Sequence, residues 1–204
     1  MNTTVKEYCD LLVTQFNEIP EIRKALLDEI ALYIQNKLEN NKPVNLIYVC
    51  THNSRRSHFG QIWAQVASNY YGIKNIHSFS GGTEATAFNP NAINALKRVG
   101  FKVDIMKDGL NPVYHVFHDD QAAPSICFSK VYDDAANPQK EFAAIMTCSD
   151  AEENCPLITG VELRLGTAYD DPKAFDDMPE QDMKYDERCR QIALETFYVF
   201  SKIK

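Results

Sequence analysis

One segment of the chain carries a cysteine, an arginine and a serine at spacings suited to nucleophilic chemistry on an anion. The residues Cys50-Thr51-His52-Asn53-Ser54-Arg55-Arg56-Ser57, here called the Cys50 loop, follow a short apolar stretch and precede a helical pattern. A loop between a strand and a helix points successive backbone N–H groups, with the positive end of the helix dipole, at whatever lies inside it. The sequence therefore predicts an oxyanion-binding loop formed by residues 51–57.

Cys50 is the predicted nucleophile of this loop. The helix dipole and the guanidinium of Arg56 should stabilise its thiolate at neutral pH. Arg56 can also fork two oxygens of a tetrahedral oxyanion, which suits a transition state whose charge spreads over several oxygens. Ser57 can donate to the Cys50 sulfur, and Asn53 tolerates the left-handed backbone that a tight loop demands. Together these residues could transfer a phosphate-like group.

An acid and two further cysteines lie later in the chain. An acid must protonate the leaving oxygen in such chemistry, so Asp171, which precedes Pro172 in a predicted loop, is the candidate general acid, with Asp170 as the alternative. Cys148 and Cys155 are seven residues apart. If the residues between them were regular helix, their Cα atoms would be about 10 Å apart, beyond the roughly 7 Å that a disulfide allows. A disulfide between them would therefore require this segment to unwind.

The elements that must position these residues alternate between strands and helices. Short apolar stretches predict strands, and apolar residues at helical spacing predict helices, over residues 44–49, about 57–66, 76–79, 90–99, 142–147, 161–165 and 182–201. This alternation predicts a three-layer α/β domain with a mostly parallel sheet. Since Cys50, Cys148 and Asp171 each follow a predicted strand, we expect them to meet at the carboxyl edge of that sheet.

Two regions fall outside this alternation. Residues 1–43 contain two amphipathic helical patterns, and we expect an N-terminal helical extension that packs on the rest of the chain. Residues 109–139 contain two β-rich runs, 112–117 and 126–132, separated by a polar, turn-prone stretch, which predicts an inserted β-hairpin. The catalytic domain is then expected to span residues 44–204, including the hairpin.

Composition limits the classes of function and location. The chain has 204 residues, of which 45% are hydrophobic and 24% charged, as expected for one globular domain. Its net charge of −7 offers no basic surface for a nucleic acid. No apolar run approaches the roughly 20 residues of a membrane span, and the charged N-terminus does not resemble a secretory signal. We therefore expect a soluble, cytoplasmic protein without nucleic-acid or membrane partners.

The remaining cysteines and histidines predict packing rather than metal chemistry. Six cysteines at irregular spacing, without a signal peptide, suggest reduced thiols instead of a disulfide framework. Cys9 and Cys189 lie in predicted helices and Cys127 in a predicted strand, so their expected role is packing. The histidines show no metal-ligand spacing and no Cys-x2-Cys pair exists, so no metal cofactor is expected.

The Cys50 loop resembles the active-site loop of the low-molecular-weight tyrosine phosphatase superfamily, whose usual form is Cys-x-Gly-Asn-x-Cys-Arg-Ser. Similarity at residues 80–84, 89–93, 147–156 and 169–172 narrows the resemblance to the thioredoxin-coupled arsenate reductase branch. It covers roughly residue 44 to the C-terminus, apart from the hairpin segment. Two residues depart from the pattern, because His52 stands where the family usually has glycine and Arg55 where it usually has a second cysteine. Neither removes a group that the chemistry requires.

The resemblance implies a cysteine relay with no bound cofactor. Cys50 would attack arsenate, Cys148 would attack the Cys50 adduct and release arsenite, and Cys155 would leave a Cys148–Cys155 disulfide for thioredoxin to reduce. Two alternatives stay open: a low-molecular-weight protein-tyrosine phosphatase acting through a Cys50 phosphocysteine with Arg56 and Asp171, and a non-catalytic oxyanion-binding module. The relay cysteines favour the reductase, because a phosphatase of this kind needs neither.

Overall fold

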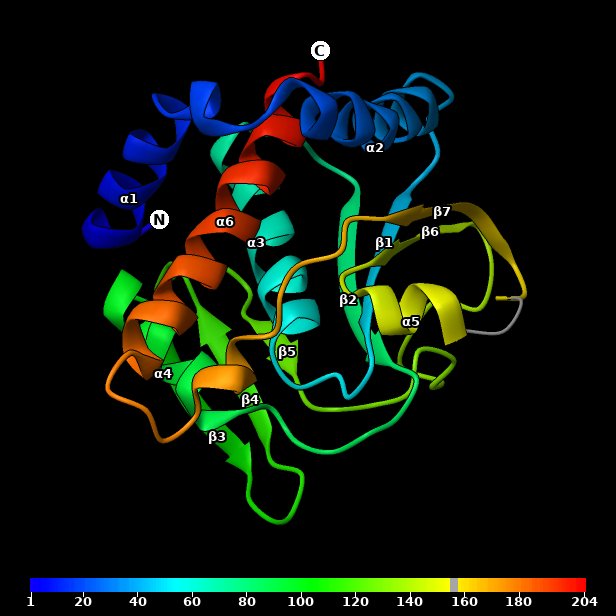
Figure 1. Cartoon of the computed structure of the whole chain (residues 1–204). Coiled ribbons are helices and arrows are strands. Elements are labelled where there is room, and N and C mark those ends of the chain that lie inside the picture. Colours follow the sequence, from blue (N-terminus) through cyan, green and yellow to red (C-terminus); the bar gives the residue numbers. More distant parts are fainter. Residues whose placement is uncertain (155–157) are drawn as a thin grey trace.

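A parallel four-stranded sheet lies at the centre of the computed structural model, which describes residues 1–154 and 158–204 (Figure 1). Its strands follow the order β2-β1-β6-β7 and comprise β1 (Val44–Cys50), β2 (Ile76–Gly82), β6 (Phe142–Met146) and β7 (Val161–Gly166). Because β1 pairs in parallel with both β2 and β6, Cys50 ends an inner strand with a neighbour on each side. The predicted α/β architecture with a mostly parallel sheet is confirmed.

The inner strands are buried on both faces, which explains their nearly unbroken apolar sequences. In β6 every residue is buried, and in β1 only Asn45 is partly exposed. Successive side chains point to opposite faces. Leu46, Tyr48 and Ile145 therefore belong to the larger core on one face, whereas Val49 and Met146 belong to a smaller core on the other.

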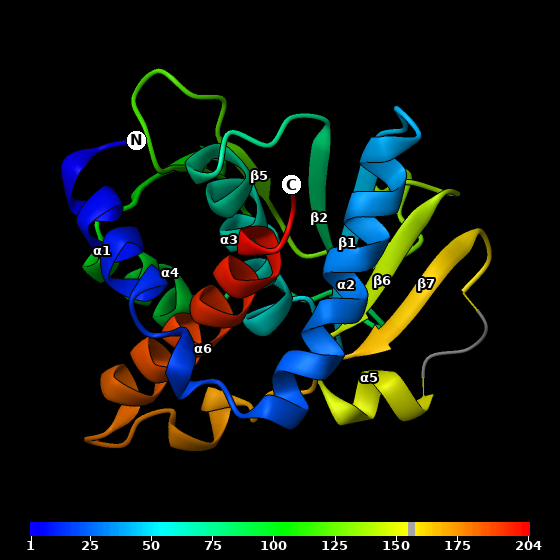
Figure 2. The same ribbon diagram turned by 90° about the horizontal axis from the view of Figure 1, so that it is seen from above.

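Helices cover both faces of the sheet. The larger core lies between the sheet and α2 (Glu21–Glu39), α3 (Arg56–Tyr70) and α6 (Gln181–Ser201). The short helix α5 (Ser149–Asn154) contacts β1 and β6, and its Ala151 lies in the smaller core on the opposite face. Figure 2 shows α1 (Thr3–Val13) and α4 (Pro90–Val99) beside α6, on its side away from the sheet.

The helix boundaries follow the local sequence signals. The N-terminal region forms α1 and α2, as its spacing predicts, joined through the 3-10 turn η1 (Phe16–Glu18). In α4, the Asn89 side chain accepts hydrogen bonds from the N–H groups of Asn91 and Ala92, with Pro90 at the first helical position. Gly100 ends this helix at a φ of 113°, in the left-handed region that favours glycine.

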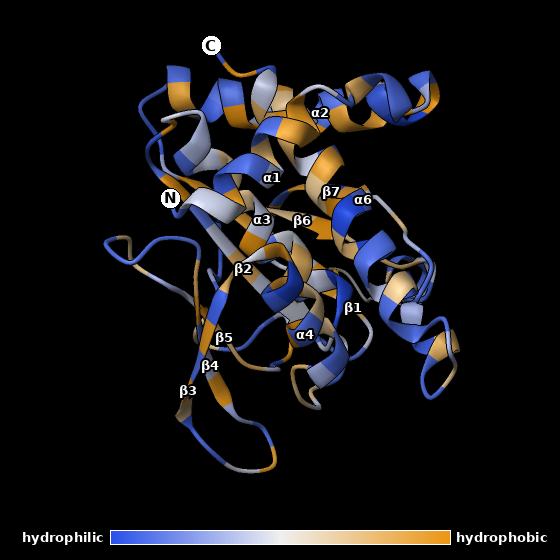
Figure 3. Cartoon of the chain, turned by 90° about the vertical axis from the view of Figure 1, so that its left-hand side faces the viewer, coloured by the Kyte–Doolittle hydropathy of each residue, from blue (hydrophilic) through white to orange (hydrophobic). Residues whose placement is uncertain are grey.

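The predicted β-hairpin is present and belongs to a larger sheet. This sheet is antiparallel and has three strands, β3 (Lys102–Lys107), β4 (Val113–Phe117) and β5 (Ser125–Cys127), beside α3 and α4. β4 and β5 are the two predicted strands of the hairpin, and the edge strand β3, which pairs with β4, was not predicted. Figure 3 shows hydrophobic and hydrophilic residues mixed along these strands and their connecting loop.

The second predicted run, residues 126–132, continues as a strand only to Cys127. Beyond it, backbone N–H groups donate to side chains instead of extending the ladder: Ser129 donates to Asn111 Oδ1 at 3.1 Å and Lys130 to Asn53 Oδ1 at 2.9 Å. The division into a residue 1–43 extension and a residue 44–204 domain stays a prediction. In the described part of the chain, no helix combines the length and apolar character needed to cross a membrane.

Candidate active site

Cys50 lies at the carboxyl end of β1 with its sulfur facing Ser57. The thiol is buried, and its Sγ is 3.1 Å from Ser57 Oγ. Asn53, whose φ of 43° is left-handed, donates from Nδ2 to the same Ser57 oxygen at 2.8 Å. Because the Ser57 hydroxyl accepts from Asn53, its own proton is available to Cys50. This arrangement stabilises a negative charge on the sulfur.

The backbone of the Cys50 loop offers a row of unused donors. Within the described residues, no backbone N–H from His52 to Ser57 donates to a protein acceptor. The loop leads directly into α3, a helix of 15 residues that begins at Arg56. Unpaired N–H groups at the start of such a helix form an anion-binding site. This backbone can therefore hold a tetrahedral oxyanion against Cys50.

Two other segments hold the Cys50 loop in place, one after β2 and one after β5. Their hydrogen bonds run from Glu84 N to Thr51 O (2.8 Å), from Ser54 Oγ to Ala87 O (2.7 Å), from Ser129 Oγ to His52 O (2.9 Å) and from Lys130 N to Asn53 Oδ1 (2.9 Å). Gly82 leaves room for this packing, since a Cβ there would lie 2.4 Å from the Glu84 oxygen. The loop is fixed before any ligand arrives.

Arg56 connects the Cys50 loop to residues 169–171, here called the acid segment because they include the candidate acid Asp171. Its Nη1 donates to the Tyr169 carbonyl and its Nη2 to Asp171 Oδ2, each at 2.7 Å. Nε is buried and has no hydrogen-bond partner. The guanidinium edge formed by Nε and Nη2, which can grip two oxygens of an anion, is thus half occupied by Asp171.

The structure distinguishes the two candidate acids. Asp171 lies against Arg56 and accepts a hydrogen bond from Lys173 N at 3.0 Å, at the start of the 3-10 helix η2 (Pro172–Phe175). Asp170 has a side chain that is 98% exposed and lies 3.5 Å from Arg188. Within the described residues, Asp171 contacts a residue of the Cys50 loop and Asp170 does not.

The two departures from the family pattern point their side chains away from the loop backbone. Arg55 Nε donates to the Tyr185 hydroxyl on α6 at 2.8 Å, and its Nη2 lies 3.6 Å from Asp176. His52 is on the surface, with its Nε2 3.7 Å from a carboxylate oxygen of Glu84. Arg55 adds positive charge to the acid segment, and both residues keep their N–H groups in the predicted oxyanion-binding backbone.

Cys148 lies beside the Cys50 loop, just after β6. Its buried Sγ is 3.5 Å from Thr51 Oγ1 and accepts a hydrogen bond from Ala151 N at 3.4 Å. The Thr51 hydroxyl also donates to Asp150 Oδ2 at 2.7 Å, which ties α5 to the loop. The structure thus brings together the Cys50 loop and the cysteine predicted to be the first of the relay. Cys155, the second relay cysteine, lies outside the described residues.

Arg23, on α2, is a residue that the sequence analysis missed. Its Nε donates to Glu195 at 2.9 Å, its Nη2 donates to the Thr167 carbonyl at 2.7 Å, and its guanidinium lies 4.8 Å from the centre of the Tyr169 ring. Tyr169 is the residue whose carbonyl holds Arg56. Arg23 thus supports the segment that leads to the acid. No local signal marks a single arginine on an amphipathic helix for this role.

The other described cysteines lie in the hydrophobic core, as predicted. Burial raises the pKa values of the Cys9, Cys127 and Cys189 thiols to about 12, so these thiols are protonated at neutral pH. Across residues 1–154 and 158–204, no group of three His, Cys, Asp or Glu side chains is arranged to hold a metal ion.

Comparison with known proteins gives two kinds of similarity, although no family model matches the chain. The chain is 26% identical over 129 residues to arsenate reductase 2 of Staphylococcus epidermidis, covering 62% of this chain and 77% of the relative. It is 29% identical over 136 residues to the arsenate reductase of Brevibacillus brevis, covering 66% and 80%. A solved low-molecular-weight phosphotyrosine phosphatase from Vibrio cholerae shares the fold, with a TM-score of 0.50 at 15% identity, covering 78% of this chain and 95% of that one.

The similarities to arsenate reductases and to the phosphatase fold are consistent with the Cys50 loop that follows β1 and with Cys148, which follows β6. The sequence relatives are arsenate reductases, and the shared fold is that of the phosphatases. The chain is thus similar in sequence to arsenate reductases and shares the fold of a low-molecular-weight phosphotyrosine phosphatase.

Proposed function

We propose that this protein is an arsenate reductase in which Cys50 is the nucleophile and Cys148 and Cys155 form a relay. One observation carries the proposal. The Cys148 sulfur lies 3.5 Å from the hydroxyl of Thr51, the residue that follows the nucleophile. A phosphatase needs only a nucleophile, an anion-binding loop and an acid, whereas reduction of arsenate also needs a second thiol at this place.

The first step is attack on arsenate held in the Cys50 loop. In a guanidinium group, Nε–H and one terminal N–H point in the same direction, and in Arg56 these are the unpartnered Nε and the nitrogen that holds Asp171. An arsenate that takes both nitrogens displaces Asp171. The Cys50 thiolate then forms the S–As bond, and the As–O bond breaks. Asp171 in its protonated form gives its proton to the leaving oxygen, which departs as water.

The second step transfers two electrons to arsenic. The Cys148 thiolate attacks the Cys50 sulfur and forms an S–S bond, and the S–As bond breaks with its electron pair remaining on arsenic. Arsenic is thereby reduced from the +5 to the +3 state and leaves as arsenite. Cys155 then attacks Cys148, releasing Cys50 as a thiolate and leaving a Cys148–Cys155 disulfide.

An external dithiol must reduce this disulfide, and we assign that role to thioredoxin in the cytoplasm. No metal or bound cofactor takes part in the proposed cycle. Residues 149–154 form the helix α5. Regular helix would keep Cα atoms seven residues apart about 10 Å from each other, so forming the disulfide requires α5 to unwind at least in part.

The test compares arsenate reduction and phosphate-ester hydrolysis in the same preparations. The reduction assay contains thioredoxin, thioredoxin reductase and NADPH, and follows NADPH oxidation. Cys155→Ser should stop after one turnover with a Cys50–Cys148 disulfide, which peptide mapping without reductant identifies. Ester hydrolysis should persist in this variant, because it needs neither relay cysteine. Cys127→Ser, which alters a buried thiol elsewhere in the core, is the matched control and should retain both activities.

A phosphatase is the second candidate, because Cys50, Arg56 and Asp171 alone suffice for it. If arsenate leaves the thiols of Cys148 and Cys155 free in the wild-type protein while phosphate esters are still turned over, the relay is rejected and the phosphatase is supported. If neither arsenate nor any ester is turned over, the site is a non-catalytic oxyanion-binding module.

A further inference from the structure

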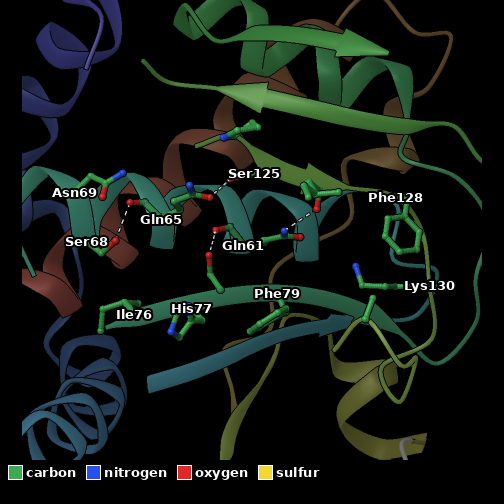
Figure 4. Close-up of a pocket in the computed structure, with 14 residues that line it drawn as sticks. Gln61, Gln65, Ser68, Asn69, Ile76, His77, Phe79, Ser125, Phe128 and Lys130 are labelled. Carbon is green, nitrogen blue, oxygen red and sulfur yellow. Dashed lines mark hydrogen bonds between the residues drawn. The ribbon is translucent and has the colours of Figure 1, made fainter. Parts of the chain in front are cut away.

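A cavity that Cys50 does not line lies between α3, β2 and the chain that runs from β5 to Ala136 (Figure 4). Its volume is about 400 Å³, enough for a small organic molecule. The residues that matter most for its chemistry are Gln61, Ile76, Phe79, Ile126, Phe128 and Lys130. None of them takes part in the proposed cysteine chemistry.

Lys130 supplies an unpaired positive charge to this cavity. The residue is only 5% exposed, and Nζ lies 4.4 Å from the centre of the Phe128 ring. No carboxylate of the described residues lies within 4.0 Å of this ammonium. Burial lowers the pKa of Lys130, and Asp134, which lies beyond ion-pair distance, only partly opposes this effect. Lysine is almost never this buried without a paired anion, so a ligand anion would complete its surroundings.

Gln61 supplies an unused acceptor at the same end of the cavity, as Figure 4 shows. Its Nε2 donates to the Ile126 carbonyl at 3.0 Å, which fixes the orientation of the amide. Its Oε1 is buried and has no hydrogen-bond partner in the described structure. A buried acceptor of this kind is normally paired, so the ligand should bring a hydrogen-bond donor.

The rest of the lining limits the ligand further. Phe79 and Phe128, with Ile76 and Ile126, give the cavity apolar walls suited to a flat ring. Lys130 is the only lysine or arginine among the lining residues, so the site matches one negative charge better than the two of a phosphate monoester. We propose that this cavity binds a small aromatic carboxylate that also carries a hydroxyl or amino donor, with its carboxylate at Lys130 and its donor at Gln61.

The experiment uses 3-hydroxybenzoate and 4-hydroxybenzoate as probes and measures binding to the whole chain by titration calorimetry. At least one should bind saturably at one site per chain. The matched neutral amide should bind at least about tenfold more weakly, since it lacks the charge for Lys130. Benzoate, which lacks the donor for Gln61, should lose about threefold or more.

Variants assign the binding to this cavity. Lys130→Met should weaken binding of the hydroxybenzoate at least about tenfold, whereas Lys107→Met, at an exposed lysine of β3, should leave it unchanged. Arg56→Ala should retain binding, because the probe does not occupy the Cys50 loop. The amide comparison uses the wild-type protein, so it decides the question even if Lys130→Met unfolds.

The proposal is overturned if neither hydroxybenzoate binds up to millimolar concentration, or if the acid and its amide bind equally. Binding that disappears in Arg56→Ala, or that inorganic phosphate competes away, would place the probe in the Cys50 loop and also overturn it. These outcomes are independent of whether the protein reduces arsenate.

Discussion

The Cys50 loop and the segment after β6 both follow inner strands of the same sheet, but they are held in different ways. Hydrogen bonds from the segments after β2 and after β5 fix the Cys50 loop from two directions. The segment after β6 forms α5, which has six residues, far fewer than the roughly 12 that an isolated helix needs for marginal stability. Its described ties include Thr51 to Asp150 and Arg164 to the Glu152 carbonyl.

The difference corresponds to the two tasks in the proposed cycle. A nucleophile gains from donors that are already in position, because no free energy is then spent on arranging them during the reaction. A relay cysteine must instead exchange one sulfur partner for another, which requires its backbone to move. Short elements with few buried contacts open at low free-energy cost. We therefore expect a rigid backbone at the proposed nucleophile Cys50 and an adaptable backbone at the proposed relay cysteine Cys148.

Removing the nucleophile should have the largest effect. Cys50→Ser is expected to lower both arsenate reduction and phosphate-ester hydrolysis by about 10³-fold or more, because a serine hydroxyl is a much weaker nucleophile than a cysteine thiolate. Cys148→Ser, on the adaptable side of the comparison, should abolish only arsenate turnover and leave ester hydrolysis within about threefold. Steady-state assays check both. Ester hydrolysis lost equally in the two variants would contradict the separation of tasks.

Removing the support of the acid segment should have an intermediate effect. Arg23→Ala deletes two hydrogen bonds and leaves the buried Glu195 without its ion pair, so the free energy of unfolding should fall by about 3 kcal/mol. Hydrolysis of aryl phosphates should slow by about tenfold, and most for poor leaving groups, because these depend on the proton from Asp171.

Urea unfolding and a series of aryl phosphates measure the two effects of Arg23→Ala. Arg190→Ala is the matched control, since its ion pair with Glu18 lies on the surface at 2.7 Å and should contribute less than about 1 kcal/mol. Equal slowing for good and poor leaving groups would show that Arg23 supports the fold without positioning the acid.

Loosening the tie between α5 and the Cys50 loop should have the smallest effect. Asp150→Ala removes the acceptor for the Thr51 hydroxyl, so arsenate turnover should change by about two- to fivefold while ester hydrolysis stays constant. Glu153→Ala, at an exposed residue of the same helix, should change neither rate. An equal change in both reactions would mean that this tie serves the nucleophile rather than the relay.

The sequence predicted the elements that have strong local signals. Apolar runs marked the buried parallel strands, and Asn89, Pro90 and Gly100 marked the ends of α4. β3 was missed because it lies at a sheet edge, where charged residues such as Lys102 and Lys107 interrupt the apolar pattern. Residues 128–132 were predicted as strand because their composition is β-rich. In the structure the N–H groups of Ser129 and Lys130 donate to side chains, and that of Tyr132 donates to the Gly82 carbonyl instead of extending the ladder.

The positions of candidate site residues were predictable where those residues lie at the ends of strands. Cys50 and Cys148 follow paired parallel strands, so sheet topology alone brings them to one edge. The contacts of Arg23 and Arg55 were not predictable, because each depends on an element far away in the sequence. The contact of Arg56 Nη2 with Asp171, which leaves Nε without a partner, also depends on how residues 169–171 run past the Cys50 loop. The spacing of residues in the sequence does not predict that contact.

The hydrogen bond from Lys130 N to Asn53 makes the segment that follows β5 part of the support of the Cys50 loop. An insertion or deletion between β5 and Lys130 would move this donor and leave the buried Asn53 carboxamide oxygen without its partner. The length of the chain between β5 and Lys130 therefore helps to set the conformation of the Cys50 loop.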